Sequence, residues 1–319
     1  MIFYYNYDRK ILTLHVIQSN PSINIINSAD VSNVSSFQLP DPAGRAAGAC
    51  TSALLNVMYT DKRKPDDDIS FKDVLFKMRE LLDEQGFTQI PQLTSSRSLQ
   101  MDTKFDLSPD VEAFNGTKRA VLIGINYVGQ DGELAGCHND VLNMVEYLKD
   151  VHEFQDHNMT LLMDDDDDDH IDPTNQNIIR AYQDIVNASE PGDVVYLHYS
   201  GHGGKVRDDD KDEEDGYDET LIPVDFQTNG MLRDDDLLEY VIKPLKRGVF
   251  VTSVMDCCHS GTVLDLPYKF QADGSQESME EDAGFNFGDG NGDGNVDMDD
   301  LVNAAAGVIK TGCPGCRIS

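Results

Sequence analysis

Two short stretches of the chain place a reactive side chain directly after an apolar run. His202 has a glycine on each side and follows Val-Val-Tyr-Leu-His-Tyr at 194–199. Cys258 lies in Asp-Cys-Cys-His-Ser-Gly and follows the apolar run 249–254. A thiol that gives its proton to an imidazole is a nucleophile for carbonyl carbons. The pair therefore predicts covalent catalysis on an acyl group.

Either residue alone favours a structural role. A free cysteine is most often a small buried hydrophobe, and a histidine next to a strand is more often a hydrogen-bonded structural residue than a catalyst. The glycines around His202 change this balance, because glycine lets backbone N–H groups approach a substrate closely. The functional interpretation rests on the two motifs together.

Both motifs need a sheet that delivers them to one edge. Buried strands without polar alternation are predicted at 119–125, 194–199 and 249–255, with helices at 140–149 and 174–188. This alternation predicts an α/β fold with a mainly parallel sheet covered on both faces. The carboxyl ends of such strands are where α/β proteins place their ligands.

His-Tyr-Ser-Gly-His-Gly-Gly at 198–204 and Asp-Cys-Cys-His-Ser-Gly at 256–261 together resemble the catalytic pair of the metacaspases, cysteine peptidases of the caspase-like clan. The separation of 56 residues (258 − 202) is also close to that between the caspase His and Cys. The resemblance implies a caspase-like three-layer α/β/α sandwich, with Cys258 as nucleophile and His202 as base. It also implies an oxyanion site made by the backbone N–H groups of Gly203 and Cys258.

The resemblance also extends to the region before the catalytic motifs. Residues 10–17 and 23–26 alternate as strands, apolar residues at helical spacing occupy 44–59, and a capped helix is predicted over 70–86. The segment 81–96 is similar to the end of the metacaspase small-subunit region, which precedes the catalytic region in the type III subgroup. We therefore expect a small-subunit-like region at 1–115 that packs on the same sheet, a catalytic region at 116–275 and an acidic tail at 276–319.

Metacaspases cleave after Arg or Lys, so the resemblance implies peptide or protein substrates with basic residues. Two carboxylates in a partly desolvated site suit a guanidinium or ammonium group. The positions that match the family's substrate-binding residues are Cys137, Asp140, Ser200 and Asp256.

The formal charge of −33 argues against nucleic acid as a partner and for calcium or basic substrates. A solvated acidic surface is the simpler interpretation for most of the 58 acidic residues, including the run 164–169. The run 208–218 with 233–236 is dense enough in carboxylates to favour a bound cation. By resemblance, the calcium ligands are Asp218, Asp234, Asp235 and Asp265.

A second calcium loop is a weaker expectation at 289–300, which follows much of the EF-hand pattern. Its last position is Asp where a bidentate Glu is usual, and a disordered Gly/Asp-rich linker fits about as well. The candidate ligands are Asp289, Asn291, Asp293, Asn295 and Asp300.

Six cysteines without the spacing of small secreted proteins indicate reduced thiols and a cytoplasmic location. No signal peptide or membrane span is evident, and the family resemblance implies a monomer. Two alternatives stay open. One is a catalytically silent calcium-binding scaffold of the same fold. The other is a thiol-redox sensor that uses Cys257, Cys313 and Cys316.

Overall fold

The computed structural model describes residues 10–18, 37–38, 46–59, 69–87, 89–96, 98–105, 115–207, 217–257, 264, 266 and 268–281. Its elements before residue 116 are β1 (Lys10–Gln18), β2 (Phe37–Gln38), β3 (Ala46–Ala47), α1 (Ala49–Met58), α2 (Phe71–Glu84) and β4 (Gln89–Ser95). Next come β5 (Lys118–Gly124), α3 (Cys137–His152), η1 (Asp156–Asn158), β6 (Met159–Met163), α4 (Asn175–Ala188), β7 (Val194–Ser200), β8 (Gly203–Arg207) and β9 (Tyr217–Leu221). The last are α5 (Phe226–Asn229), β10 (Leu232–Arg233), α6 (Asp234–Leu237), η2 (Leu238–Ile242), β11 (Phe250–Asp256), β12 (Tyr268–Gln271) and β13 (Glu280–Glu281).

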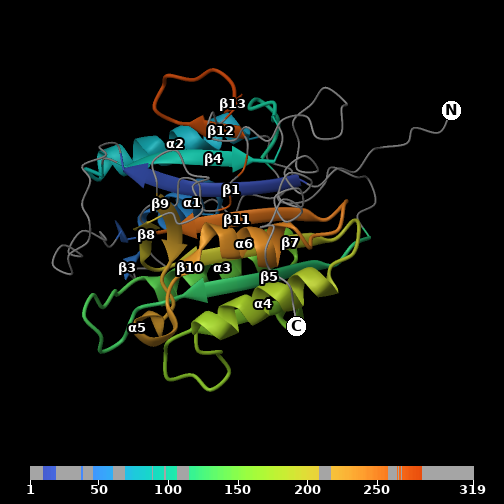
Figure 1. Ribbon diagram of the computed structural model, residues 1–319. Helices are drawn as coiled ribbons and strands as arrows, with labels where there is room; N and C mark the ends of the chain where they lie inside the picture. The colour runs from blue at the N-terminus through green and yellow to red at the C-terminus, as the bar shows by residue number, and fades with distance from the viewer. Residues whose placement is uncertain are drawn as a thin grey trace, which may run out of the picture.

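The main sheet has the strand order β13-β12-β4-β1-β11-β7-β5-β6 in the described part of the chain (Figure 1). Strands β1, β11, β7, β5 and β6 pair in parallel, whereas β4, β12 and β13 add an antiparallel edge. Strand β11 thus lies between β1 and β7, inside the sheet and away from both edges.

The register of the central pair decides where the chain leaves the sheet before each motif. Asp256, the last residue of β11, lies opposite Ser200, the last residue of β7. His202 and Cys258 each come two residues later in the chain. Because the strands are parallel, both motifs leave the sheet at the same edge.

Alternate side chains of the central strands enter two separate cores. Ala120 and Leu122 of β5 pack in one core with α1, α2 and α3, whereas Val121 and Ile123 pack in the other with α4 and η2. This period of two is what a strand buried on both faces requires. The result is the three-layer α/β/α arrangement around a mainly parallel sheet, so the predicted fold class is confirmed.

The predicted helices and strands are present in the described residues with one exception: within the helical spacing predicted at 44–59, Ala46–Ala47 form β3 and the helix begins at Ala49. The predicted helix at 70–86 is α2, whose N-cap Ser70 accepts a hydrogen bond from the Asp73 N–H at 3.0 Å. Gly86 follows the helix with φ of 81°, a left-handed conformation that favours glycine. The predicted strand at 23–26 lies outside the described residues.

Strands β1 and β4 come from the segment before residue 116 and lie in the same sheet as β11. A small three-stranded sheet, β10-β9-β8, begins with β8 shortly after β7, and the acidic residues described below lie on β9 and at the start of α6. Within the described ranges, no helix combines the length and apolar character needed to cross a bilayer. The domain boundaries at 115 and 275 stay predictions.

Candidate active site

His202 lies in the short link between β7 and β8, with its imidazole half-buried. Its Nε2 is 2.7 Å from the carbonyl oxygen of Gly132. A carbonyl can only accept, so Nε2 carries the proton and Nδ1 of the neutral ring is left with a lone pair. The backbone of Gly132 therefore selects the tautomer in which Nδ1 can take up a proton.

Two tyrosines fix the backbone and the ring of His202. The ring centroid of Tyr127 lies 4.6 Å from that of His202, and the Tyr127 hydroxyl accepts the His202 N–H at 3.0 Å. The Tyr199 hydroxyl donates to the His202 carbonyl at 2.8 Å. Burial lowers the pKa of His202, and the hydrogen bond to Gly132 opposes this shift. These contacts hold the imidazole in place, and its burial favours the neutral form.

Cys258 itself lies outside the described residues. The preceding residue, Cys257, is 9% exposed and packs in the core. The register of β11 and β7 brings position 256 beside position 200, two residues before each member of the expected dyad. The sheet therefore supports the pairing of His202 and Cys258 through its backbone alone.

Gly203 is the first residue of β8 and lies opposite Leu221 of β9. The Ile222 N–H donates to the His202 carbonyl at 3.2 Å, so the pair 202–222 is of the hydrogen-bonded kind. Hydrogen-bonded and non-hydrogen-bonded pairs alternate in antiparallel strands. The Gly203 N–H consequently points away from β9 and takes no part in the pairing of β8 with β9.

The four expected substrate-binding residues all lie at the carboxyl edge of the sheet. Asp140 is fully buried in the first turn of α3, and its Oδ2 accepts the Ser200 hydroxyl at 2.6 Å. Cys137, at the start of the same helix, is 4% exposed and also hydrogen-bonds with Ser200. Asp256 remains partly exposed at the end of β11. The structure thus brings these four residues together.

Asp140 and Asp256 are close enough to affect each other electrostatically. Burial raises the pKa of Asp140, and the charge of Asp256 raises it further. Burial also raises the pKa of Asp256, while hydrogen bonds from Thr51 and Cys50 oppose the shift. A cation placed beside the two carboxylates would favour their ionised forms.

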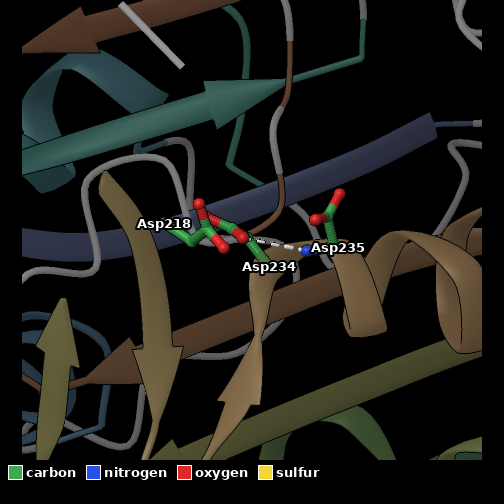
Figure 2. Close-up of side chains that lie close together, drawn as sticks. All are labelled: Asp218, Asp234 and Asp235. Atoms are coloured by element: carbon green, nitrogen blue, oxygen red, sulfur yellow. Dashed lines mark hydrogen bonds between the residues drawn. The ribbon is translucent and has the colours of Figure 1, made fainter. Parts of the chain in front are cut away.

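Three of the four expected calcium ligands also converge. One carboxylate oxygen each from Asp218, Asp234 and Asp235 lie within 4.8 Å of one another (Figure 2). Asp218 is 2% exposed and Asp234 is 3% exposed. Figure 2 shows Asp218 on β9 and the other two at the start of α6. Asp265, the fourth expected ligand, lies outside the described residues.

The donor set of this cluster fits calcium. Burial raises the pKa of Asp234 to about 8, and the charges of Glu219 and Asp218 add to the shift although two N–H bonds oppose it. The guanidinium of Arg233 contacts Asp218 at 2.8 Å and compensates part of the negative charge. Carboxylate oxygens that lie this close together are the kind of ligand that calcium takes.

The acidic run 164–169 is only partly the solvated loop that we expected. Residues 166–169 are exposed, but the Asp164 side chain is 8% exposed. It accepts the N–H of Asn126 at 2.8 Å and of Val128 at 3.1 Å, and it contacts His138 Nε2 at 2.7 Å. The expectation was wrong for Asp164 because two N–H groups of the neighbouring loop and the His138 side chain of α3 compensate its burial.

The sequence gives little sign of several residues that shape the site. They act through backbone groups or through neighbours distant in the chain, which no local pattern reveals. Gly132 offers a carbonyl, and Tyr127 has φ of 54° in a loop of no recognisable motif. The second expected metal loop, at 289–300, lies outside the described residues.

Comparison with known proteins agrees with this geometry. Residues 118–267 match the family model described as metacaspase, peptidase C14 domain. The protein named metacaspase III c of Phaeodactylum tricornutum is 59% identical over 266 residues, which cover 83% of this chain and 78% of that protein. Metacaspase-1 of Pyricularia oryzae is 46% identical over 53% of this chain, and metacaspase-1A of Aspergillus oryzae is 42% identical over 65%.

The chain spans 43% of the Pyricularia protein and 50% of the Aspergillus protein. The diatom match is longer than the stretch from residue 116 to residue 319, so it extends into the first 115 residues. The type III resemblance thus covers both the catalytic region and the region before it. A cysteine peptidase follows from the family. The chain belongs to the metacaspases, in their type III subgroup.

Proposed function

We propose that this cysteine peptidase cleaves peptide bonds after Arg or Lys through a Cys258–His202 dyad and is activated by calcium. The observation that carries the proposal is the register of Asp256 with Ser200. It supports the proposal that the Cys258–His202 dyad lies at the same edge of the sheet as the two carboxylates described above. The acidic pair, Asp140 and Asp256, gives this edge its preference for a cation.

The reaction follows from the tautomer of His202. The Cys258 thiol loses its proton to Nδ1 of the imidazole and its sulfur attacks the peptide carbonyl carbon. The resulting oxyanion accepts hydrogen bonds from the N–H groups of Gly203 and Cys258, each worth about 3 kcal/mol. The C–N bond then breaks, and the imidazolium returns the proton to the leaving amine. Attack by water on the thioester releases the acyl product and restores the thiol.

The different exposures of Asp140 and Asp256 support different tasks for the two carboxylates. Asp256 is partly exposed, so its carboxylate can contact the basic side chain of the substrate. Asp140 is fully buried and bonded to Ser200, so it contributes mainly through its charge. Two negative charges in a low-dielectric site favour a guanidinium over a neutral side chain.

Calcium would be held by Asp218, Asp234 and Asp235, with Asp265 as a further ligand by family resemblance. When bound, the ion would neutralise their charges and join β9 to the start of α6. Strand β9 pairs with β8, which begins directly after His202. An ion at this cluster would therefore stabilise the small sheet that carries the oxyanion donor Gly203.

The test is hydrolysis of reporter peptides that end in Arg, Lys, Asp or citrulline, with calcium and with a chelator. We expect turnover of the Arg and Lys reporters only, in calcium only, and none by Cys258→Ala. Citrulline has the shape of Arg without the charge, so equal turnover of both would contradict the charge argument. A wild-type chain that is inactive on every reporter in calcium would indicate a silent calcium-binding scaffold instead.

A further inference from the structure

Helix α1 begins without a capping side chain of its own. Its N-cap is Gly48, and no acidic residue occupies its first turn. Exposed N–H groups at the start of a helix need acceptors and favour negative charge. Here the acceptors come from the catalytic region, 92 and 205 residues away in the chain. The acidic pair therefore caps α1.

The contacts between α1 and the acidic pair are direct. The Gly48 N–H donates to both oxygens of Asp140, at 2.8 and 2.9 Å. The Thr51 N–H donates to Oδ2 of Asp256 at 2.8 Å. The donors described for the two carboxylates are N–H and hydroxyl groups, which carry no net charge. Among the described residues, no cation contacts these carboxylates that a basic substrate would have to displace.

Gly48 fills the space between the two carboxylates. A Cβ at this position would lie 2.2 Å from Oδ2 of Asp256 and 2.7 Å from Oδ2 of Asp140. Its φ of −67° is open to any residue, so space and not backbone conformation requires glycine here. A side chain at position 48 would push the carboxylates apart or lift α1 from them.

Thr51 connects α1 with both central strands. Its side chain is fully buried, and its hydroxyl lies 3.1 Å from Nε2 of His198 on β7. The same hydroxyl hydrogen-bonds the carboxylate of Asp256 on β11. Since a carboxylate only accepts, the hydroxyl donates to Asp256 and accepts from His198. The orientation of Asp256 is thereby fixed from one side.

We propose that Gly48 and Thr51 are specificity-determining positioning residues, which hold the carboxylates of Asp140 and Asp256 as an oriented anionic pair for a basic substrate side chain. The inference rests on the proposed Arg/Lys specificity. It assigns part of the substrate selection to the region that precedes the catalytic region in this chain. Burial alone would favour protonation of both carboxylates, and the donors of α1 oppose it.

The variant that tests this is Thr51→Val, which keeps the shape of the side chain and removes its hydroxyl. The lost hydrogen bond should raise KM for the Arg reporter about fivefold to tenfold, with kcat within about twofold. The acidic limb of kcat/KM should move to higher pH, because Asp256 loses a donor that favours its ionised form. Thr51→Ser should restore both values.

Ser52→Ala is the matched control. Ser52 is the next residue of α1, is fully buried, and its hydroxyl has no hydrogen-bond partner in the described residues. Its KM and pH profile should equal those of the wild type. Gly48→Ala should raise KM more than Thr51→Val does, since it displaces both carboxylates. A thermal melt of every variant shows whether it is folded.

Two results would overturn the inference. If Thr51→Val keeps the wild-type KM and pH profile, the hydroxyl does not position Asp256. If Thr51→Val lowers kcat/KM by the same factor for the Arg and the citrulline reporters, the Thr51 hydroxyl has only a structural role. Both results are read against a wild-type protein that cleaves the Arg reporter faster than the citrulline reporter. If the wild type cleaves both equally, the proposed Arg/Lys specificity is wrong, and this inference falls with it.

Discussion

The ring of Tyr127 lies against the imidazole of His202, and its hydroxyl accepts the His202 N–H. The same hydroxyl donates to the Ile222 carbonyl at 2.6 Å. Tyr127 thus hydrogen-bonds the backbone just before β8, at His202, and just after β9, at Ile222. Its ring also covers the imidazole. A single residue, Tyr127, therefore contacts both the ring and the backbone of the proposed base.

Replacing Tyr127 by Phe keeps the stacked ring and removes these two bonds. We expect a loss of about 1–3 kcal/mol in the free energy of unfolding, because buried partners lose their hydrogen bonds. We also expect kcat to fall while KM stays nearly constant. Urea unfolding and steady-state kinetics measure the two effects. Tyr182→Phe is the control, since the buried Tyr182 hydroxyl has no partner in the described residues. Equal losses in both variants would contradict the assignment.

Asp164→Asn tests the anchor of the loop that carries Tyr127 and Gly132. Burial raises the pKa of Asp164, but hydrogen bonds from His138, Asn126 and Val128 outweigh it, so the pKa lies below its ordinary value. An amide cannot accept from all of these donors, and we expect a loss of about 1–3 kcal/mol in unfolding free energy and a lower kcat.

Asp167→Asn, in the same acidic run, is the matched control because Asp167 is exposed. It should change neither stability nor kcat. If Asp164→Asn behaves like Asp167→Asn, the hydrogen bonds of Asp164 do not stabilise the loop.

The buried His198 should make the protein less stable as the pH falls. Burial lowers its pKa to about 3 from an ordinary value of 6.5. Between these values the unfolded chain binds a proton that the folded chain does not, so the free energy of unfolding decreases with decreasing pH. Urea unfolding of Cys258→Ala at pH 7 and pH 5, with and without His198→Gln, measures this slope. Glutamine can donate to Thr51 and does not titrate, so the slope should flatten; an unchanged slope would assign the effect to other groups.

Calcium should raise the melting temperature of the protein, because an ion that binds only the folded state stabilises it by mass action. Asp234→Asn should remove most of this shift, since it removes one charge from the buried cluster. The exposed Asp184, which pairs with Arg180, provides the control Asp184→Asn. A shift that survives in Asp234→Asn but is lost in Asp293→Asn would assign calcium to the loop at 289–300.

The sequence was sufficient for the elements whose signal is local. Ser70 and Gly86 mark the ends of α2, and the apolar runs give β5, β7 and β11. The short strands β8, β9 and β10 carry glycine and charged residues in place of an apolar pattern, so no strand signal identified them. Their pairing depends on contacts with each other and with the Tyr127 loop.

The candidate site follows the same division. His202 and Asp256 belong to recognisable motifs, and the family resemblance added Asp140 and Ser200 to the candidate site. Gly132 and Thr51 could not be found in this way. Gly132 contributes only a carbonyl oxygen, and Thr51 lies 205 residues from the carboxylate it orients. Such contacts are defined by the packing of distant segments and not by any residue pattern.

The order of strands in the main sheet also predicts how the protein behaves after its chain is cleaved. Strand β4 pairs with β1 on one side and with β12 on the other, and β1 in turn pairs with β11. Strands from before residue 116 therefore pair on both sides with strands from after residue 249, within one sheet. A nick between residues 105 and 115 would leave both fragments migrating as one particle on a sizing column, and only denaturant would separate them.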